Sequence, residues 1–258
     1  MRRLLALLLL APTTVLALEG VAYQGEAREP KSGALLYEEH HYLRLNQEAP
    51  VERLVLYRCP NGEAFARKTV RYGRPSHAPQ FRMDDARFGY IEGFEIQPGG
   101  ADAFFQRSRD AAMQREAVAV DDALVVDAGF DEFVRSRWEQ LQAGESVPVR
   151  FLVPSRLAAY DFKLRKVGEE PLYGEPASVF RLALSGMLGW FADAIDVSYR
   201  DSDRRLMRFV GLSNIRATPD KNLVAKIEFP PQREQRGLSD AEWAAASSEP
   251  LRECRVGE

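Results

Sequence analysis

Two Glu/His pairs stand side by side in one extended stretch of the chain. Glu38 and His40 are two residues apart, and Glu39 and His41 repeat that spacing one position later. Residues two apart on a β-strand share a face, so either pair could hold a metal ion or act as a general acid and base. The two pairs point to opposite faces and cannot share one ion. Such pairs also occur on solvated strand faces, so a site and a plain surface both stay open.

Carboxylates also gather at two expected turns. One holds Asp84, Asp85 and Glu92, and the other holds Asp201 and Asp203. Clusters of this kind can bind Ca²⁺, but neither has the ligand number or spacing of a known calcium loop. Asp is an ordinary turn residue for backbone reasons, and turn formation is therefore the favoured interpretation. We expect no metal at either place.

Motifs for nucleophilic catalysis or cofactor binding are not found. The chain has no G-x-S-x-G elbow, S-x-x-K, C-x-x-C, G-x-G-x-x-G or phosphate-binding loop. We therefore assign no catalytic residue and expect no cofactor. The formal net charge of −3 gives no electrostatic reason to expect nucleic acid as a partner.

Aromatic residues are the remaining lead to a function. A many-stranded barrel can enclose more volume than its side chains fill, and aromatic residues on its inner face could then line a cavity for a lipid or another apolar molecule. The alternative is that they simply pack in the core. The residues that we expect at such a cavity are Tyr37, His41, Phe130, Trp138, Trp190 and Phe191.

Short strands separated by turns account for most of the chain. Side chains alternate over residues 34–45, and residues 51–58 are apolar in the pattern of a strand buried on both sides. Asn61-Gly62 predicts a hairpin turn that leads into a strand over residues 63–72. Further turns at regular spacing predict an antiparallel meander of a dozen or so strands, which favours a closed or partly open β-barrel. A two-sheet β-sandwich is the alternative.

One amphipathic helix, expected over about residues 129–143, interrupts the strands. Asp127 is interpreted as its cap and Gly144 as its left-handed end. We expect the helix to cover a barrel mouth or a sheet face. Its apolar stripe consists of Phe130, Phe133, Val134, Trp138 and Leu141.

The chain is expected to divide into three parts. Residues 1–17 have the order of a signal peptide: a positive start, a short apolar run and small residues before a cleavage site after Ala17. The run is too short to cross a membrane, which needs about 20 apolar residues. Residues 18–229 form one β-rich domain, and residues 230–258 form a tail with a short helix that begins at a Ser239/Glu242 capping box.

The two cysteines fit export to the periplasm or beyond. In an oxidising compartment Cys59 and Cys254 are more often bridged than free, and a bridge would tie an early strand to the tail. Two separate thiols are the alternative.

Two segments resemble recurring stretches of uncharacterised secreted proteins from proteobacteria: the first runs from Val126-Asp127-Ala128-Gly129-Phe130-Asp131 to Trp138, the second from Leu206 to Asn214. That resemblance covers most of the mature chain and implies no activity. The overall pattern is also similar in architecture to periplasmic carriers built on open β-barrels, although fold does not determine function.

Three functions follow as hypotheses. The first is a periplasmic carrier that holds an apolar or lipid-like ligand between the barrel wall and the helix. The second is an envelope hydrolase that uses one of the Glu/His pairs. The third is a structural or assembly partner in the envelope.

Overall fold

The computed structural model describes residues 18–185 and 194–257. The expected signal peptide therefore lies outside the described residues, as do Trp190 and Phe191. The first half of the described chain contains strands β1 (Glu19–Arg28), β2 (Leu35–Asn46), β3 (Ala49–Arg58), β4 (Ala64–Arg71), β5 (Gln80–Asp85), β6 (Tyr90–Gln97), β7 (Gly100–Gln106), β8 (Gln114–Ala117) and β9 (Leu124–Val125).

Helices and strands follow in the second half. They are α1 (Gly129–Ser136), α2 (Trp138–Gln142), β10 (Val147–Val153), the short 3₁₀ helix η1 (Pro154–Arg156), β11 (Ala158–Leu172), β12 (Glu175–Leu184), β13 (Ile195–Arg200), β14 (Leu206–Thr218), β15 (Lys221–Glu228), η3 (Pro231–Arg233), β16 (Glu234–Arg236) and α3 (Asp240–Ser248).

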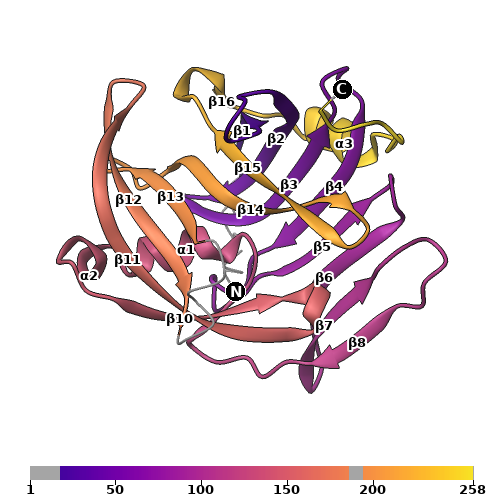
Figure 1. The fold of residues 1–258 in the computed structure, drawn as a ribbon, viewed down its shortest axis with the longest axis horizontal. Helices are drawn as coiled ribbons and strands as arrows, with labels where there is room; N and C mark the ends of the chain where they lie inside the picture. The colour runs from indigo at the N-terminus through magenta and orange to yellow at the C-terminus, as the bar shows by residue number, and fades with distance from the viewer. Residues whose placement is uncertain (1–17, 186–193, 258) are drawn as a thin grey trace, which may run out of the picture.

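All the described strands belong to one curved sheet of 16 strands. Its order is β8-β7-β6-β5-β4-β3-β2-β1-β15-β14-β13-β12-β11-β10-β9, with β16 paired to β1. Neighbours are antiparallel except β9 and β10, which are parallel. The sheet curls round without closing by hydrogen bonds, and η1 lies against β6 and β7 near its open seam (Figure 1). The partly open barrel is confirmed, and the alternative of a two-sheet sandwich is wrong.

Strand β3 is buried on both sides, as its sequence predicts. Val55 and Tyr57 face the inside of the barrel, whereas Leu54 and Leu56 face outward. The tail covers this outer face with α3, which begins at the predicted capping box: the Ser239 side chain accepts a hydrogen bond from the backbone N–H of Glu242, and the Glu242 side chain accepts one from the backbone N–H of Ser239. Strand β3 therefore contributes side chains to a cluster on each face of the sheet.

A disulfide between Cys59 and Cys254 fastens the end of the tail to the barrel, with Cα atoms 6.4 Å apart. Two further contacts hold the same segment. The Arg58 guanidinium donates two hydrogen bonds of 2.6 Å to the Glu249 carboxylate, and the backbone N–H of Arg252 donates to the Ala64 carbonyl.

The expected single helix is in fact two: α1 lies within the ring of strands, whereas α2 lies at the edge of the molecule beside β11 (Figure 1). The break is at Arg137, whose backbone leaves the helical region at φ −107° and ψ 11°. The apolar stripe nevertheless continues from α1 into α2, because Phe133, Val134, Trp138 and Leu141 pack in one cluster. Gly144 ends the pair with φ 82°, as predicted.

Candidate ligand-binding site

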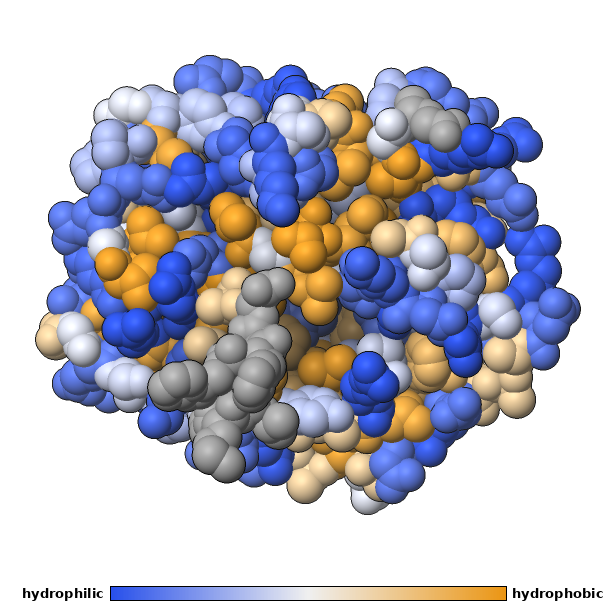
Figure 2. All heavy atoms as spheres, viewed as in Figure 1, coloured by the Kyte–Doolittle hydropathy of each residue, from blue (hydrophilic) through white to orange (hydrophobic). Residues whose placement is uncertain are grey.

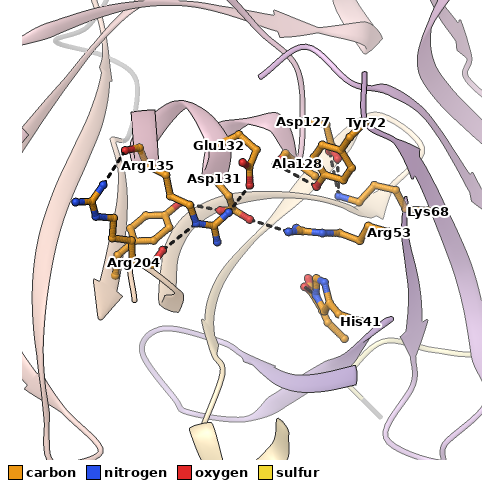
Figure 3. A network of polar contacts seen from close by, with 12 residues as sticks. His41, Arg53, Lys68, Tyr72, Asp127, Ala128, Asp131, Glu132, Arg135 and Arg204 are labelled. Atoms are coloured by element: carbon orange, nitrogen blue, oxygen red, sulfur yellow. Dashed lines mark hydrogen bonds and ion pairs between the residues drawn. The ribbon is translucent and has the colours of Figure 1, made fainter. Parts of the chain in front are cut away.

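Helix α1 faces two different walls of the barrel. Its apolar side packs against the inner face of β10–β13, where the contacting side chains are Val147, Val149, Leu164, Phe180, Leu182 and Val197. Its acidic beginning faces β3 and β4 on the opposite wall (Figure 3). The interior of the barrel therefore has an apolar wall and a polar wall.

Asp131 of α1 forms a buried ion pair with Arg53 of β3. The Arg53 Nη2 donates to Asp131 Oδ2 over 3.1 Å, and the Tyr199 hydroxyl of β13 donates to Asp131 Oδ1 over 2.8 Å. Burial opposes ionisation of Asp131, but the guanidiniums of Arg53 and Arg135 outweigh it and lower the pKa of the carboxyl. Asp131 is therefore an anion that is held from two walls of the barrel.

A second ion pair lies one turn earlier. Lys68 Nζ of β4 is 3.0 and 2.9 Å from the two carboxylate oxygens of Asp127 (Figure 3). We expected Asp127 to cap the helix, but the residue at the cap position is Ala128, and no side chain caps this end. Asp127 instead has φ 42°, a conformation that Asp tolerates better than most residues and that directs it to Lys68.

The Glu39/His41 pair lies on the inner face of β2. His41 Nε2 donates to Glu39 Oε2 over 2.8 Å, and both residues are 6% exposed. Burial lowers the pKa of His41 although the bond to Glu39 acts in the other direction, so the imidazole is neutral at pH 7. Its other nitrogen, Nδ1, is buried and has no hydrogen-bond partner among the described residues. The ring of Tyr23 stacks on the imidazole with centroids 4.5 Å apart.

His41, Arg53 and Lys68 surround Val55 on this wall. His41 on β2 and Lys68 on β4 are both opposite Val55 on β3, and Arg53 precedes it by two residues. These positions are direct and diagonal neighbours on one face of the sheet, within reach of long side chains. Arg53 is 6% exposed, and its Nε also lacks a partner in the described part of the chain. One buried acceptor, His41 Nδ1, and one buried donor, Arg53 Nε, are thus on the same wall.

The remaining inner carboxylates are already bound by their own partners. The Tyr90 hydroxyl donates to Glu92, and Arg216 donates to the Tyr90 oxygen. Arg87 makes two bonds to Asp85. Within residues 18–185 and 194–257, no group of three or more His, Cys, Asp or Glu side chains is placed to hold a metal ion.

A row of half-buried apolar side chains lies beside the polar wall. Phe130 of α1, Phe151 of β10 and Phe162 of β11 pack in sequence, with ring centroids 6.1 and 6.2 Å apart. Ile195 and Phe209 continue the row on β13 and β14, and all five remain partly exposed. Figure 2 shows apolar residues around a hollow in the middle of the face that is viewed. We call these five residues the apolar row.

The predicted cavity residues fall into different places. Phe130 is in the apolar row and His41 is on the polar wall. Tyr37 is fully buried near Tyr57 and Phe65, and Trp138 is 6% exposed against Phe180. These last two are core residues in the described contacts.

The sequence did not reveal Arg53, Lys68, Asp131 or Tyr199 as site residues. The only hint was that two basic residues stand at inward positions of β3 and β4. The outer Glu38/His40 pair, with 3.1 Å between Oε2 and Nε2, lies on the opposite face of β2 and takes no part in this site.

Comparisons with known proteins give distant structural likenesses. No family model matches the chain, and no curated protein matches it. A β-barrel-like protein of the domain of unknown function DUF1849 from Brucella abortus is similar in structure, with a TM-score of 0.47 and 6% identity over 87% of this chain and 99% of that one.

Two further structures are less similar. A DUF1329 family protein from Desulfovibrio piger has a TM-score of 0.29 and 11% identity over 88% of this chain and 90% of its own. A provisionally named outer membrane lipoprotein-sorting protein domain from Vibrio parahaemolyticus has a TM-score of 0.23 and 9% identity, covering 90% and 92%. Because all three TM-scores are below 0.5, the proposals below rest on the contacts of this chain alone. No helix of the described residues is long and apolar enough to cross a membrane.

Proposed function

We propose that the chain is an exported carrier that binds an apolar or lipid-like ligand in the open side of the barrel. The observation that carries the proposal is the apolar row. Phe130, Phe151 and Phe162 are large apolar side chains on the inside of the barrel, yet each remains partly exposed beside the open face. Concave apolar surface with a few polar groups beside it is typical of small-molecule sites.

The side chains that pack around the helices differ in how far they are buried. Trp138 and Leu141 are buried against side chains of β10–β13, with exposed fractions of 6% and 0%. The partly exposed apolar surface consists of the apolar row, whose residues lie on α1, β10, β11, β13 and β14. An alkyl chain laid along the row would cover it and gain about 25 cal/mol for each Å² of apolar surface removed from water.

The test is binding of the fluorescent apolar probe N-phenyl-1-naphthylamine to purified, delipidated protein. We expect saturable binding that weakens at least about tenfold in Phe162→Thr and Phe209→Thr, since burying a Phe side chain is worth about 1.5–3 kcal/mol. Leu212→Thr is the matched control, because Leu212 lies on the same strand as Phe209 but is 51% exposed.

Two results would count against the carrier. One is an absence of saturable probe binding by the folded wild type. The other is an equal loss of affinity in the control variant, which would place the probe outside the row. Circular dichroism of each variant shows that its sheet is intact.

A hydrolase that uses Glu39 and His41 is a second candidate, favoured by the free Nδ1 of a neutral, carboxylate-bound imidazole. It predicts turnover of p-nitrophenyl laurate that falls at least about a hundredfold in His41→Gln and not in His40→Gln. A rate in the wild type equal to that of buffer removes this candidate and leaves the carrier untouched.

A further inference from the structure

The polar wall beside the apolar row contains two buried hydrogen-bonding atoms without partners among the described residues. His41 Nδ1 needs a donor, because Nε2 carries the proton that is given to Glu39. Arg53 Nε carries a proton and needs an acceptor. A buried polar group without a partner costs about 1–3 kcal/mol, so a ligand that satisfies both atoms gains from each.

The wall is continuous with the apolar row. Leu206 and Phe209 pack both against the cluster around α1 and against the cluster that contains Tyr23 and Phe229. Tyr23 stacks on His41, and Phe229 meets the same imidazole edge-on at 5.4 Å. A chain-like molecule lying on Phe209 would therefore have its end directed to His41 and Arg53.

The charges of the wall are already balanced. The three cations drawn in Figure 3 around Asp131 and Asp127 each have a carboxylate partner: Arg53 is paired with Asp131, Lys68 with Asp127, and Arg135 with Glu132. Glu39, whose partner is a neutral imidazole, leaves no positive charge to spare. A carboxylate or phosphate head would thus be desolvated with no free cation to meet it.

We infer that the ligand of the proposed carrier ends in a neutral group that both donates and accepts hydrogen bonds, a hydroxyl above all, which bridges His41 Nδ1 and Arg53 Nε. A carboxylate offers no donor to His41, an ammonium offers no acceptor to Arg53, and an ester offers only acceptors. A hydroxyl supplies both functions. The inference rests on the proposed carrier function and names the chemical class of its ligand.

Competition against the bound naphthylamine probe tests the inference with three molecules that share one alkyl chain. They are 1-monomyristoylglycerol, myristate and methyl myristate, each used below its aggregation concentration. We expect the monoglyceride to displace the probe at concentrations about five- to tenfold lower than the other two, since one neutral hydrogen bond is worth about 0.5–1.5 kcal/mol. Equal or tighter displacement by myristate overturns the inference.

A variant pair on β2 assigns the effect to the residue. His41→Gln keeps a donor for Glu39 and loses the acceptor at Nδ1, so it should abolish the preference for the monoglyceride while the probe still binds. His40→Gln, on the outer face of the same strand, should keep the preference. A preference unchanged in His41→Gln overturns the inference.

The wild type alone gives a second readout. In ¹⁵N-labelled protein the monoglyceride should shift the resonance of the unprotonated His41 Nδ1, because that nitrogen becomes a hydrogen-bond acceptor, and methyl myristate should leave it in place. An unmoved resonance at saturation overturns the inference. If the probe itself does not bind, the carrier function has failed; if it binds without preference among the three molecules, only the headgroup assignment has failed.

Discussion

The two walls that face α1 bury opposite kinds of chemistry. The wall of β10–β13 meets the helices with aliphatic and aromatic side chains, whereas the wall of β2–β4 meets them with His41, Arg53 and Lys68. Apolar contact is not directional and stabilises any position of the helix that covers the surface. The two ion pairs are directional, because buried charges must be paired, and they determine which way round α1 lies. The contacts that stabilise the helices against the barrel and the contacts that orient α1 thus come from different halves of the barrel.

The comparison is tested most strongly at the Asp131–Arg53 pair. Asp131→Asn leaves Arg53 buried without a counter-charge, and removal of one partner of a buried pair costs about 3–5 kcal/mol of the free energy of unfolding. Urea denaturation measures the loss. Arg53→Met/Asp131→Asn should regain more than half of it, because no unpaired charge remains. A double variant as unstable as the sum of its two single variants would contradict this account.

An exposed ion pair serves as the control. Asp203 accepts two bonds from Arg200 but is 47% exposed, so Asp203→Asn should change the free energy of unfolding by less than about 1 kcal/mol.

The apolar wall should behave differently. Leu141→Ala removes a fully buried side chain and should cost about 3 kcal/mol, by lost transfer energy and by the cavity left behind. Leu212→Ala, at an exposed position, should stay within about 0.5 kcal/mol. If Leu141→Ala costs under 1 kcal/mol, the apolar wall does not hold the helices.

The apolar wall could be predicted from the sequence, whereas the polar wall could not. Period-two alternation predicted β2, the apolar run over residues 51–58 predicted β3 and its burial on both sides, and the stripe of Phe133, Val134 and Leu141 predicted the helical face. These patterns are local, and the hydrophobic effect acts on them wherever they meet apolar surface.

The ion pairs could not be predicted because their partners are far apart in the chain. Arg53 and Asp131 are separated by 78 positions, and Lys68 and Asp127 by 59. An Arg on a strand and an Asp in the first turn of a helix each have an ordinary local explanation, a solvated face and the helix dipole. Only the curvature of the sheet brings them together. The break at Arg137 was missed for a similar reason, because the apolar stripe itself continues across it.

Removal of the disulfide tests how far the polar wall depends on the tail that covers the outer face of β3. Cys59 lies at the end of β3, and the tail that Cys254 fastens covers the outer face of the same strand. Cys59→Ser/Cys254→Ser should cost about 2–3 kcal/mol, mainly by releasing the unfolded chain from a long loop.

Loss of the disulfide should also increase local opening of the tail. The amides of Arg252 and Gly257, which donate to the Ala64 and Leu36 carbonyls, should exchange with solvent faster than in the wild type, while amides within α1 keep their rates. Faster exchange throughout α1 would mean that the tail supports the helices as well as β3.

The smallest expected effect is a pH dependence of the free energy of unfolding, which arises from His41 on the polar wall. The pKa of His41 is lowered by burial, with Arg53 and Lys68 acting in the same direction and Glu39 against them. The unfolded chain therefore binds more protons than the folded one just below the unfolded pKa of about 6.5, and stability falls as pH falls through that window. One histidine contributes at most about 1.4 kcal/mol per pH unit.

His41→Gln should therefore lose about 1 kcal/mol less than the wild type between pH 7 and pH 5, by urea denaturation at each pH. The difference between the two proteins isolates His41 from the other groups that titrate. His40, whose pKa burial also lowers, is common to both. Glu92, whose pKa burial raises, acts with the opposite sign and is likewise common to both. Parallel pH profiles would mean that the imidazole is protonated equally in the folded and unfolded chains, and burial would then not lower the pKa of His41.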